Sequence, residues 1–497
     1  MDPLFAGGTA GESVPGDIEK LVDTLRQEQG VTLLCDDYIN GIQADPWAPD
    51  EFDQEYAELK ERAKTNLIRL PPLVASEVST VEGYRRIVKY DENGNAVSDR
   101  FPEEFKDFRR LRFGSLQQVV HTSSANYGQA FVAVYKDADG LPGAEILSSV
   151  NTTALWDNPV SDEFPRSVLT IIHGPSTDEK RKGLAYAWDS VNKYMLTTND
   201  DGEWVISDRG EHGFSRTPVV RFPCFLDSEG RVSGMVENLI SAQDRVNQSV
   251  LDLLTGQAYT GNQIYTIAGV RGEQEFELDG TPKLDEQGRP VYKPFRMSAR
   301  RVLTSDSETT KFDRIPAGSL QDLLAALGNS LEMFAVLGQQ SAYIFHGKIS
   351  NMSADSLAAL DSQFFRLIEH LHTQWGEGWA SLFRLFAEAR GNAEGMSAWD
   401  VEVRWADYSI RTFSATADGL AKIADALEIP AEGLWHMVPS VSSSTIEFWR
   451  ELKARQADFG DGMDPNDPEE FNRQVEMSLA KFESSPDPDR DIYDEGI

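Results

Sequence analysis

The sequence contains few residue patterns that could perform catalysis. It has no G-x-x-x-x-G-K-[ST] loop to cradle ATP phosphates, no G-x-G-x-x-G turn that opens a dinucleotide site, and no G-x-S-x-G nucleophile elbow. Its two cysteines, Cys35 and Cys224, are too few for a disulfide framework or a cysteine-based zinc site. The motifs that bind a nucleotide, activate a serine or hold zinc are therefore absent from the chain.

Histidine and carboxylate side chains offer no better catalytic arrangement. His370 and His372 are two residues apart on a predicted helix, so their side chains point about 200° apart and cannot share a metal ion. With 81 acidic residues in the chain, pairs such as Glu369 with Glu377 arise by chance. We predict that the chain is not an enzyme and that it binds no cofactor or metal.

The composition narrows the class of protein. The 497 residues include 47 Lys and Arg against 81 Asp and Glu, a formal net charge of −34. A protein that wraps DNA or coats an anionic membrane needs a basic face, so both classes are unexpected here. An acidic surface does suit nucleic acid that must slide past without binding. A hydrophobic content of 40% supports a sizeable core, and because no run of 18 apolar residues exists, we expect no membrane-spanning helix.

The elements in the first half of the chain are of two kinds. Residues 17–30 and 50–67 have helical patterns and predict two helices. Between residues 84 and 225, short apolar runs such as 130–135 alternate with acidic turns that end in glycine, such as 137–140. This alternation indicates an antiparallel β-rich domain.

Two helices with apolar seams follow the β-rich region. Their seam residues recur with alternating spacings of four and three: Met235, Leu239, Ala242, Val246, Ser249 and Leu253, then Leu320, Leu324, Leu327, Leu331 and Phe334. Such a seam suits packing against another helix. The pair flanks an insert of about 55 residues, so we predict a hairpin-like stalk with a knob at its end.

The remainder of the chain begins with a polar, irregular stretch at 339–352. A long helix follows, whose apolar stripe extends from residue 357 to 386, and Gly376 and Gly378 are the place where it would bend. The later elements are a strand at 401–405 and helices at 415–427, 431–437 and 443–457. From residue 459 onward, acidic residues and prolines predict a disordered tail.

Three stretches of sequence, in this order, resemble one known family. The first is DYING at 37–41 followed by TNLIRL at 65–70, and the second is TPVVRF at 217–222 leading into GMVENLISAQDRVN at 234–247. The third is SNMSADSL at 350–357, at the entry to the long helix. On these motifs the chain resembles the portal proteins of tailed double-stranded-DNA bacteriophages, in the branch found in siphophages of Gram-positive and actinobacterial hosts.

The resemblance covers roughly residues 31–458 and implies an α+β portal fold, with a β-rich wing, a two-helix stem, a small α/β clip, a long kinked wing helix and a helical crown, assembled as a ring. By position, the regions are an N-terminal tail and helix (1–30), the wing (31–232), the first stem helix (233–260), the clip (261–316), the second stem helix (317–338), a tunnel loop (339–352), the long wing helix and strand (353–412), the crown (413–458) and an acidic disordered tail (459–497). Gly234-Met235 replaces the Ser-Glu that is usual in the family, which makes Glu237 the candidate for the acidic position.

The resemblance also implies a role in moving DNA. Such a ring, typically a dodecamer, stands at one vertex of the capsid, and double-stranded DNA is packaged and ejected through it. The implied partners are further copies of the chain, the large terminase, a head–tail connector or adaptor protein, and the major capsid and scaffolding proteins, with no membrane. The implied location is the portal vertex of the virion, after assembly in the host cytoplasm.

Three groups of candidate side chains follow from these positions. Polar residues of the tunnel loop would touch the DNA backbone without reading its sequence: Gln339, Gln340, His346, Lys348 and Asn351. Acidic residues of the stem would face the channel: Glu237, Asp244, Asp252, Asp322 and Glu332. Basic residues of the clip would pair with neighbouring subunits or dock a partner: Arg289, Lys293, Arg296, Arg300 and Arg301. For each group, an ordinary solvated surface is the alternative.

A second class of function stays open from the sequence. Clustered carboxylates could bind a metal ion, as in a metal-dependent nuclease or another enzyme with a carboxylate site, and sequence alone neither shows nor excludes such a cluster. An adaptor of the capsid is a third reading, although adaptors are usually much shorter than this chain.

Overall fold

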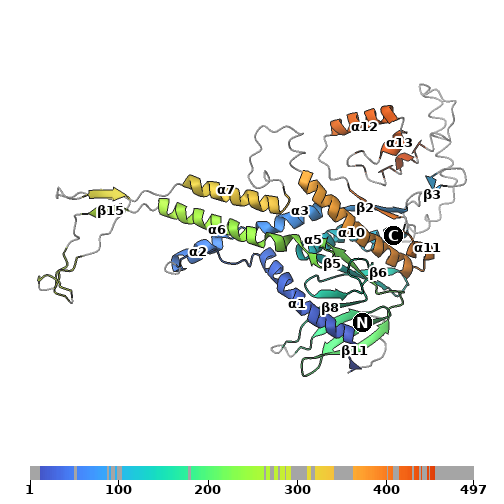
Figure 1. Cartoon of the computed structure of the whole chain (residues 1–497), viewed down its shortest axis with the longest axis horizontal. Coiled ribbons are helices and arrows are strands. Elements are labelled where there is room, and N and C mark those ends of the chain that lie inside the picture. Colours follow the sequence, from blue (N-terminus) through green and yellow to red (C-terminus); the bar gives the residue numbers. More distant parts are fainter. Residues whose placement is uncertain are drawn as a thin grey trace, which may run out of the picture. The chain divides into compact units, whose positions relative to one another are not determined.

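The computed structural model divides into two compact units, Met1–Val403 and Arg404–Ile497 (Figure 1). The residues that it describes are 12–49, 53–86, 89–90, 96–97, 103–176, 181–261, 265–268, 274–277, 280–285, 287–292, 311–314, 320–340, 362–399, 401–406, 413–427, 430–435, 438, 441, 445–446, 448–450 and 452–453. The mixture of helices and antiparallel sheets confirms the predicted α+β class.

Two antiparallel sheets form the β-rich part of the first unit, as the turn pattern predicts. Their strands are β1 (Glu12–Ser13), β5 (Gln129–Lys136), β6 (Pro142–Leu147), β7 (Thr152–Leu155), β8 (Ser167–His173), β9 (Leu184–Trp188), β10 (Asn192–Thr198), β11 (Trp204–Glu211) and β12 (Val219–Pro223). The larger sheet has the order β1-β11-β10-β9-β8-β7, and the smaller has the order β12-β5-β6. Acidic turns join neighbouring strands: the Asp137 carboxylate accepts from the Leu141 N–H at 2.8 Å, and Gly140 supplies the positive φ of 75°.

Helix α1 (Gly16–Ile39) packs against the larger sheet. Ile18 and Leu21 lie in one apolar cluster with Leu169 and Leu196. The sequence pattern placed the end of this helix near residue 30, but the helix continues for about two and a half further turns. Its last turns bury Cys35 and Tyr38 in a different cluster. The helix therefore still buries one face after the regular spacing of apolar residues in its sequence has ended.

Two helices lie where the sequence pattern indicated only strands: α4 (Glu103–Arg110) and α5 (Phe113–Tyr127). The buried residues of α5 are Phe113, Gln117, Val120, His121, Ser124 and Ala125. Because three of these side chains are polar, the apolar period that predicts a helix is hidden. The polar side chains have partners: the Gln117 Oε1 accepts from the Val81 N–H at 2.7 Å.

The long helix α10 (Ser362–Ala389) packs against α4, β5 and β12. Its two tryptophans donate buried hydrogen bonds to α5, Trp375 to Ser124 and Trp379 to His121, each at 2.9 Å. At Gly378, where the sequence predicts a bend, the helix is continuous, and a Cβ would lie 2.6 Å from Phe222 Cδ1. The glycine therefore allows a close approach between the helix and β12.

The other elements of the first unit are α2 (Asp53–Ala63), the 3₁₀ helix η2 (Leu67–Arg69), α3 (Leu70–Val78), β2 (Val81–Arg86), β3 (Lys89–Tyr90), β4 (Ala96–Val97), β13 (Phe225–Leu226), β14 (Val232–Ser233), α6 (Met235–Gly261), β15 (Tyr265–Ala268), β16 (Lys311–Arg314), α7 (Leu320–Leu337), α11 (Ala393–Met396) and β17 (Val401–Trp405), whose last two residues belong to the second unit. The second unit contains α12 (Phe413–Leu427) and α13 (Ala431–Leu434), close to the helices predicted at 415–427 and 431–437. Within it, Trp435 and Trp449 pack edge to face at 5.9 Å.

Helix α7 departs from the expectation that no helix could span a membrane. Its 18 residues have a mean hydropathy of 1.2, so among the described residues it is long and apolar enough to do so by length and composition alone. A search for an uninterrupted apolar run misses it, because polar residues such as Asp322 and Glu332 interrupt the run. Only 17% of this helix is buried within the chain.

The buried His121 and the half-buried His372 predict a loss of stability in mild acid, and the buried His212 adds to it, because desolvation also lowers its pKa. His121 is enclosed by Trp375 and Trp379, and desolvation lowers its pKa to about 3. The Nε2 of His372 lies 3.1 Å from Ser79 Oγ, and desolvation lowers its pKa to about 4. Since the ordinary histidine pKa is near 6.5, the unfolded chain binds protons that the folded chain does not. The stabilisation is thus complete above about pH 6.5 and is lost as the pH falls toward 4.

Urea unfolding at pH 7 and pH 5 measures this effect. We expect a loss of about 2 kcal/mol for each of His121 and His372 over this interval. His372→Gln should remove about 2 kcal/mol of the loss between pH 7 and pH 5, because glutamine does not titrate. The same slope in wild type and His372→Gln would contradict the prediction.

Candidate functional site: a two-helix stem and its root

Helices α6 and α7 lie side by side and pack along the predicted seam (Figure 1). Leu239, Ala242 and Val246 of α6 are buried in one cluster with Phe334 of α7. We call this helix pair the stem. The predicted spacing of four and three residues places these side chains on one face of each helix, which is why the pair forms.

The seam continues away from this cluster. The Oγ atoms of Ser249 and Ser330 lie 2.8 Å apart, and a Cβ at Gly256 would lie 2.6 Å from Leu323 Cδ1. The spacing of four and three predicts Leu324 in the seam, but this side chain is 54% exposed. Leu323 takes its place because Gly256 opens space for it.

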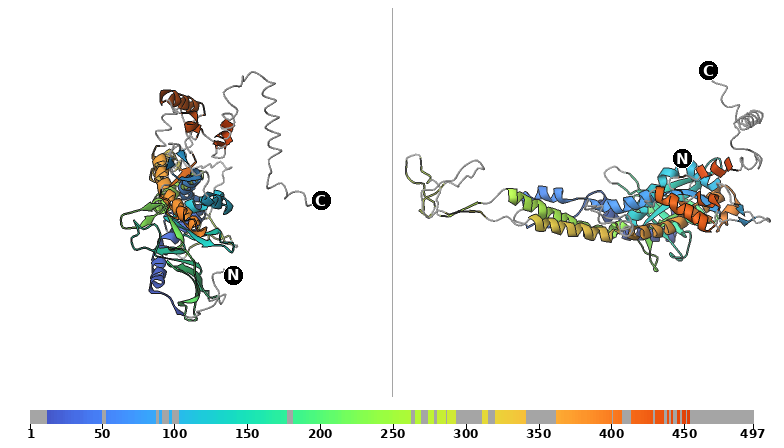
Figure 2. Two further views of the ribbon diagram at one scale, coloured as in Figure 1. Left: turned by 90° about the vertical axis from the view of Figure 1, so that its right-hand side faces the viewer. Right: turned by 90° about the horizontal axis from the view of Figure 1, so that it is seen from above.

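Helix α2 lies on the side of α6 opposite α7, and this order is the same in two perpendicular views (Figures 1 and 2). Ala63 of α2 and the preceding Ala48 pack against Leu251 of α6. The stem therefore has two different outer faces, one formed by α2 and its leading segment and the other by α7.

Buried hydrogen bonds fix the root of the stem, the part of α6 that contains Gln243 and Asn247. The Asn247 Oδ1 accepts from the Thr65 N–H at 3.1 Å, from the Thr65 hydroxyl at 3.2 Å and from Gln243 Nε2 at 2.8 Å. The Asn247 Nδ2 donates to Gln43 Oε1 at 2.7 Å. Gln243 and Asn247 are fully buried, so these bonds replace water for each side chain.

The network continues into the segment that follows α1. Gln43 donates to Asn66 at 3.1 Å, Asn66 donates to the Ile39 carbonyl at 3.1 Å, and the Ile68 N–H donates to Gln243 Oε1 at 2.9 Å. The stretches 37–41, 65–70 and 234–247, which carried the family resemblance, thus meet in one place. A buried amide left without a partner costs about 1–3 kcal/mol, so the closed network specifies how the stem attaches.

Two tyrosines add bonds from neighbouring elements. The Tyr38 hydroxyl donates to Asp244 at 2.7 Å, and the Tyr127 hydroxyl donates to Asp36 at 2.7 Å. Burial, followed by the bond to Asp244, raises the pKa of Tyr38 to about 12. Burial and the bond to Asp36 also raise the pKa of Tyr127, so both hydroxyls remain protonated donors.

A backbone contact fixes where α6 begins. A Cβ at Gly234 would lie 2.5 Å from the Asn126 carbonyl oxygen and 2.8 Å from the Gly128 nitrogen. Gly128 itself has a φ of 93°, which a side chain rarely adopts. The two glycines let the end of α5 touch the start of the stem through main-chain atoms, which explains a glycine at position 234.

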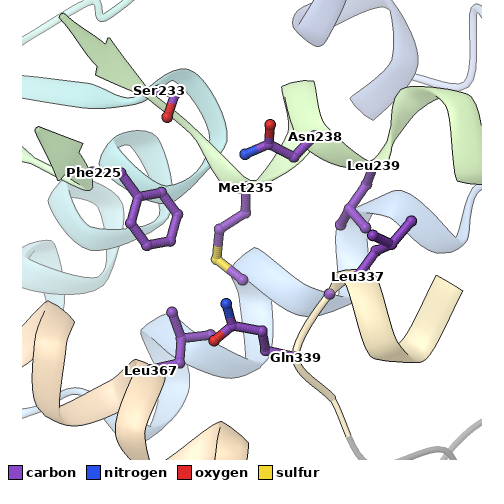
Figure 3. Close-up of a pocket in the computed structure, with 9 residues that line it drawn as sticks. Phe225, Ser233, Met235, Asn238, Leu239, Leu337, Gln339 and Leu367 are labelled. Atoms are coloured by element: carbon purple, nitrogen blue, oxygen red, sulfur yellow. The ribbon is translucent and has the colours of Figure 1, made fainter. Parts of the chain in front are cut away.

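A pocket of about 220 Å³ lies where α6 begins and α7 ends (Figure 3). Its lining consists of Phe225, Ser233, Met235, Asn238, Leu239, Leu337, Gly338, Gln339 and Leu367. Most of these side chains are apolar, and none is titratable, so the pocket has no groups for acid–base catalysis.

The described stem acids differ in their surroundings. Glu237, Asp252, Asp322 and Glu332 are exposed, whereas Asp244 is half-buried and bonded to Tyr38. Asp252 accepts from Gln248 at 3.0 Å. Which of these carboxylates face a channel depends on neighbouring subunits, so that assignment stays a prediction.

The predicted loop and clip residues are only partly described. Gln339 lines the pocket with a φ of 52°, and Gln340 is buried beside Gly338. Arg289 lies 3.8 Å from Asp285 in a short β-meander. The remaining candidates lie outside the described residues: His346, Lys348, Asn351, Lys293, Arg296, Arg300 and Arg301.

No group of three or more His, Cys, Asp or Glu side chains in the described ranges could hold a metal ion. His370 stacks on Phe225, while His372 contacts Ser79.

A family profile decides the identification. The profile described as "Phage portal protein, SPP1 Gp6-like" matches residues 35–458, which is most of the chain. The chain belongs to the phage portal protein family. Its function is therefore that of a portal protein, as the resemblance implied.

Two solved structures are similar to this portal chain. One is a chain of the virion of a native gene transfer agent (GTA) particle, with 12% identity, coverage of 83% of this chain and 98% of that chain, and a TM-score of 0.40. The other is a chain of the neck of an empty GTA particle, with 14% identity, coverage of 80% and 96%, and a TM-score of 0.40. At these values the likeness adds nothing to the assignment, which rests on the family profile. No curated protein sequence matches the chain.

Sequence reasoning missed the residues that hold the portal stem in place. Gln43 and Gln248 are not in the predicted site, although Gln43 closes the buried network and Gln248 bonds to the main chain of Trp47. The amide residues of the second stretch, Gln243 and Asn247, repeat four apart on one helix face, and this spacing was the available signal.

Proposed function

We propose that copies of this portal protein close into the ring-shaped channel through which double-stranded DNA is packaged and ejected. The observation that most supports the ring is the outer face of α7, where Met333, Val336 and Leu337 are exposed. An apolar face of this kind needs a partner in water, and a neighbouring copy supplies one in a closed ring. A dodecamer at one capsid vertex is the proposed assembly.

The proposed regions follow the sequence assignment. The stem is α6 and α7, the wing is 31–232 together with 353–412, the clip is 261–316 and the crown is 413–458. The exposed stem carboxylates suit a channel wall, because they repel phosphate and let DNA slide without tight binding. The polar loop residues, from Gln339 to Asn351, are the proposed points of contact with the DNA backbone.

The clip is the proposed docking surface, for the large terminase during packaging and for the head–tail connector afterwards. Phe276 and Leu284 are exposed there, and the Lys283 ammonium pairs with Glu275 at 3.0 Å. Apolar side chains among charged pairs suit an interface that must exchange partners. The capsid and scaffolding proteins are further proposed partners, in the host cytoplasm during assembly and then in the virion.

Particles assembled with and without the chain test this function. Procapsids made from the capsid and scaffolding proteins plus this chain should each carry one ring and package DNA with the terminase. Procapsids made without the chain should package none. Packaging at equal efficiency in both samples would refute the proposal.

A nuclease is the alternative function, and it has a direct assay. We expect no cleavage of double-stranded DNA by the purified chain with Mg²⁺ or Mn²⁺. Robust cleavage that is lost when one specific Asp or Glu is replaced by Ala would support the enzyme instead.

A further inference from the structure

Trp47 is fixed on the stem and yet exposed. Its main-chain N–H donates to Gln248 Oε1 at 2.8 Å, and its main-chain carbonyl accepts from Gln248 Nε2 at 3.3 Å. Its side chain is 75% exposed, and Ile42 in the same segment is 66% exposed. A large aromatic side chain on a fixed backbone loses little entropy when it binds, and it is the typical hot spot of a protein interface.

The other outer face of the stem is an apolar surface on α7. Its exposed apolar side chains are Met333, Val336 and Leu337, of which Val336 is 60% exposed. The only charged residues of α7 are Asp322 and Glu332. Trp47 precedes Ala48, which packs with Ala63 of α2 and Leu251 of α6, so the main chain of Trp47 lies on the side of the stem that carries α2. Helix α2 itself lies on the side of α6 opposite α7 (Figures 1 and 2).

The two faces lie at the same height along the stem. Gln248, which holds Trp47, is next to Ser249, and the Ser249 hydroxyl lies 2.8 Å from Ser330 on α7. Met333 follows Ser330 by three residues, which is about one helical turn. In a ring of parallel stems with no shift along their axes, Trp47 of one copy would lie level with the part of α7 around Met333 of the next.

We propose that Ile42 and Trp47 of one copy pack onto α7 of the next copy, around Met333 and Val336. This inference rests on the ring proposed above and names the surfaces that close it. Two different, complementary patches on opposite sides of a subunit generate a ring, whereas a two-fold dimer needs one patch that matches itself. Methionine has three rotatable bonds and a polarisable sulfur, so Met333 adapts to the face of an indole ring.

Cysteine cross-linking tests the contact in the full-length chain. Ala44→Cys and Asn329→Cys, at exposed positions that leave Trp47 and Met333 in place, are combined in one chain and treated with a bifunctional maleimide. The native Cys35 and Cys224 are buried and do not compete. The expected product is a ladder of covalent oligomers that ends at the size of the ring. Each single variant, and a control pair of Ala44→Cys with Val160→Cys on an exposed loop, should give no ladder.

Native mass spectrometry of the untreated double variant separates this inference from the ring itself. Rings that give no ladder would overturn the Trp47 contact and leave the ring proposal standing. Monomers that assemble neither alone nor with capsid and scaffolding proteins, in wild type as in the variant, would overturn both. Monomers that insert α7 into vesicles of neutral phospholipid would identify a membrane as the occupant of that face and also refute the contact.

Trp47→Ala gives an independent measure. Loss of a hot-spot aromatic should raise the protein concentration at half-assembly by about thirtyfold or more. Trp399→Ala removes the same side chain at another exposed position, away from the stem, and should leave assembly unchanged. Equal assembly of Trp47→Ala and wild type would count against the proposal.

Discussion

Replacing Asn247 with alanine is expected to lower the free energy of unfolding by about 4 kcal/mol. The Asn247 side chain accepts three hydrogen bonds and donates one, all at the buried root of the stem. Without it, the buried Gln43 Oε1 loses this partner where water cannot replace it, and the buried Gln243 Nε2 loses one of its two acceptors. Urea unfolding of the full-length chain, followed by tryptophan fluorescence, measures the change.

Asn238 provides the matched control, because it lies on the same helix and is exposed. Its single bond is to the Gly234 carbonyl at 3.3 Å, so Asn238→Ala should change stability by no more than about 0.5 kcal/mol. Equal effects of the two substitutions would show that the buried network does not stabilise the root.

Gly234→Ala is the second substitution with a large expected effect, a loss of about 3 kcal/mol. The added Cβ would lie 2.5 Å from the Asn126 carbonyl oxygen and 2.8 Å from the Gly128 nitrogen. Both neighbours are main-chain atoms, which cannot rotate away as a flexible side chain can. The end of α5 and the start of α6 must therefore separate, and we expect ring assembly to weaken together with stability.

Gly114→Ala is the control for this change. Gly114 lies in α5, and nothing is within 4 Å of a Cβ built there. Because alanine has a higher helix propensity than glycine, this variant should gain up to about 1 kcal/mol. A thermal unfolding series with both variants should thus show shifts of opposite sign, and a gain in Gly234→Ala would contradict the predicted clash.

The stem could be predicted from the sequence because the residues that form its packed face lie close together along the chain. Leu239, Ala242 and Val246 repeat with a helical period, and the period alone identifies the face that packs. The same reasoning failed at α5, where His121 and Ser124 occupy buried positions. Their burial depends on indole donors from α10, some 250 residues later in the chain, which no local pattern reveals.

The contacts at the root of the stem also could not be predicted from local sequence patterns. Asp244 was predicted as a channel acid, and the structure adds a bond to Tyr38 across 206 residues of sequence. Gln43 and Asn247, which are 204 residues apart, read as ordinary polar positions until the fold brings them together. The family motifs include Tyr38, Asp244 and Asn247 but not Gln43, and the buried network gives the physical reason for these side chains.

The mass of the assembled protein tests the central claim, that this portal chain closes into a ring. Native mass spectrometry of the purified full-length chain, with negative-stain images of the same sample, should show about a dozen subunits around a central hole. The same measurement with capsid and scaffolding proteins present covers the case in which they are needed for closure. A compact dimer in both samples would contradict the account.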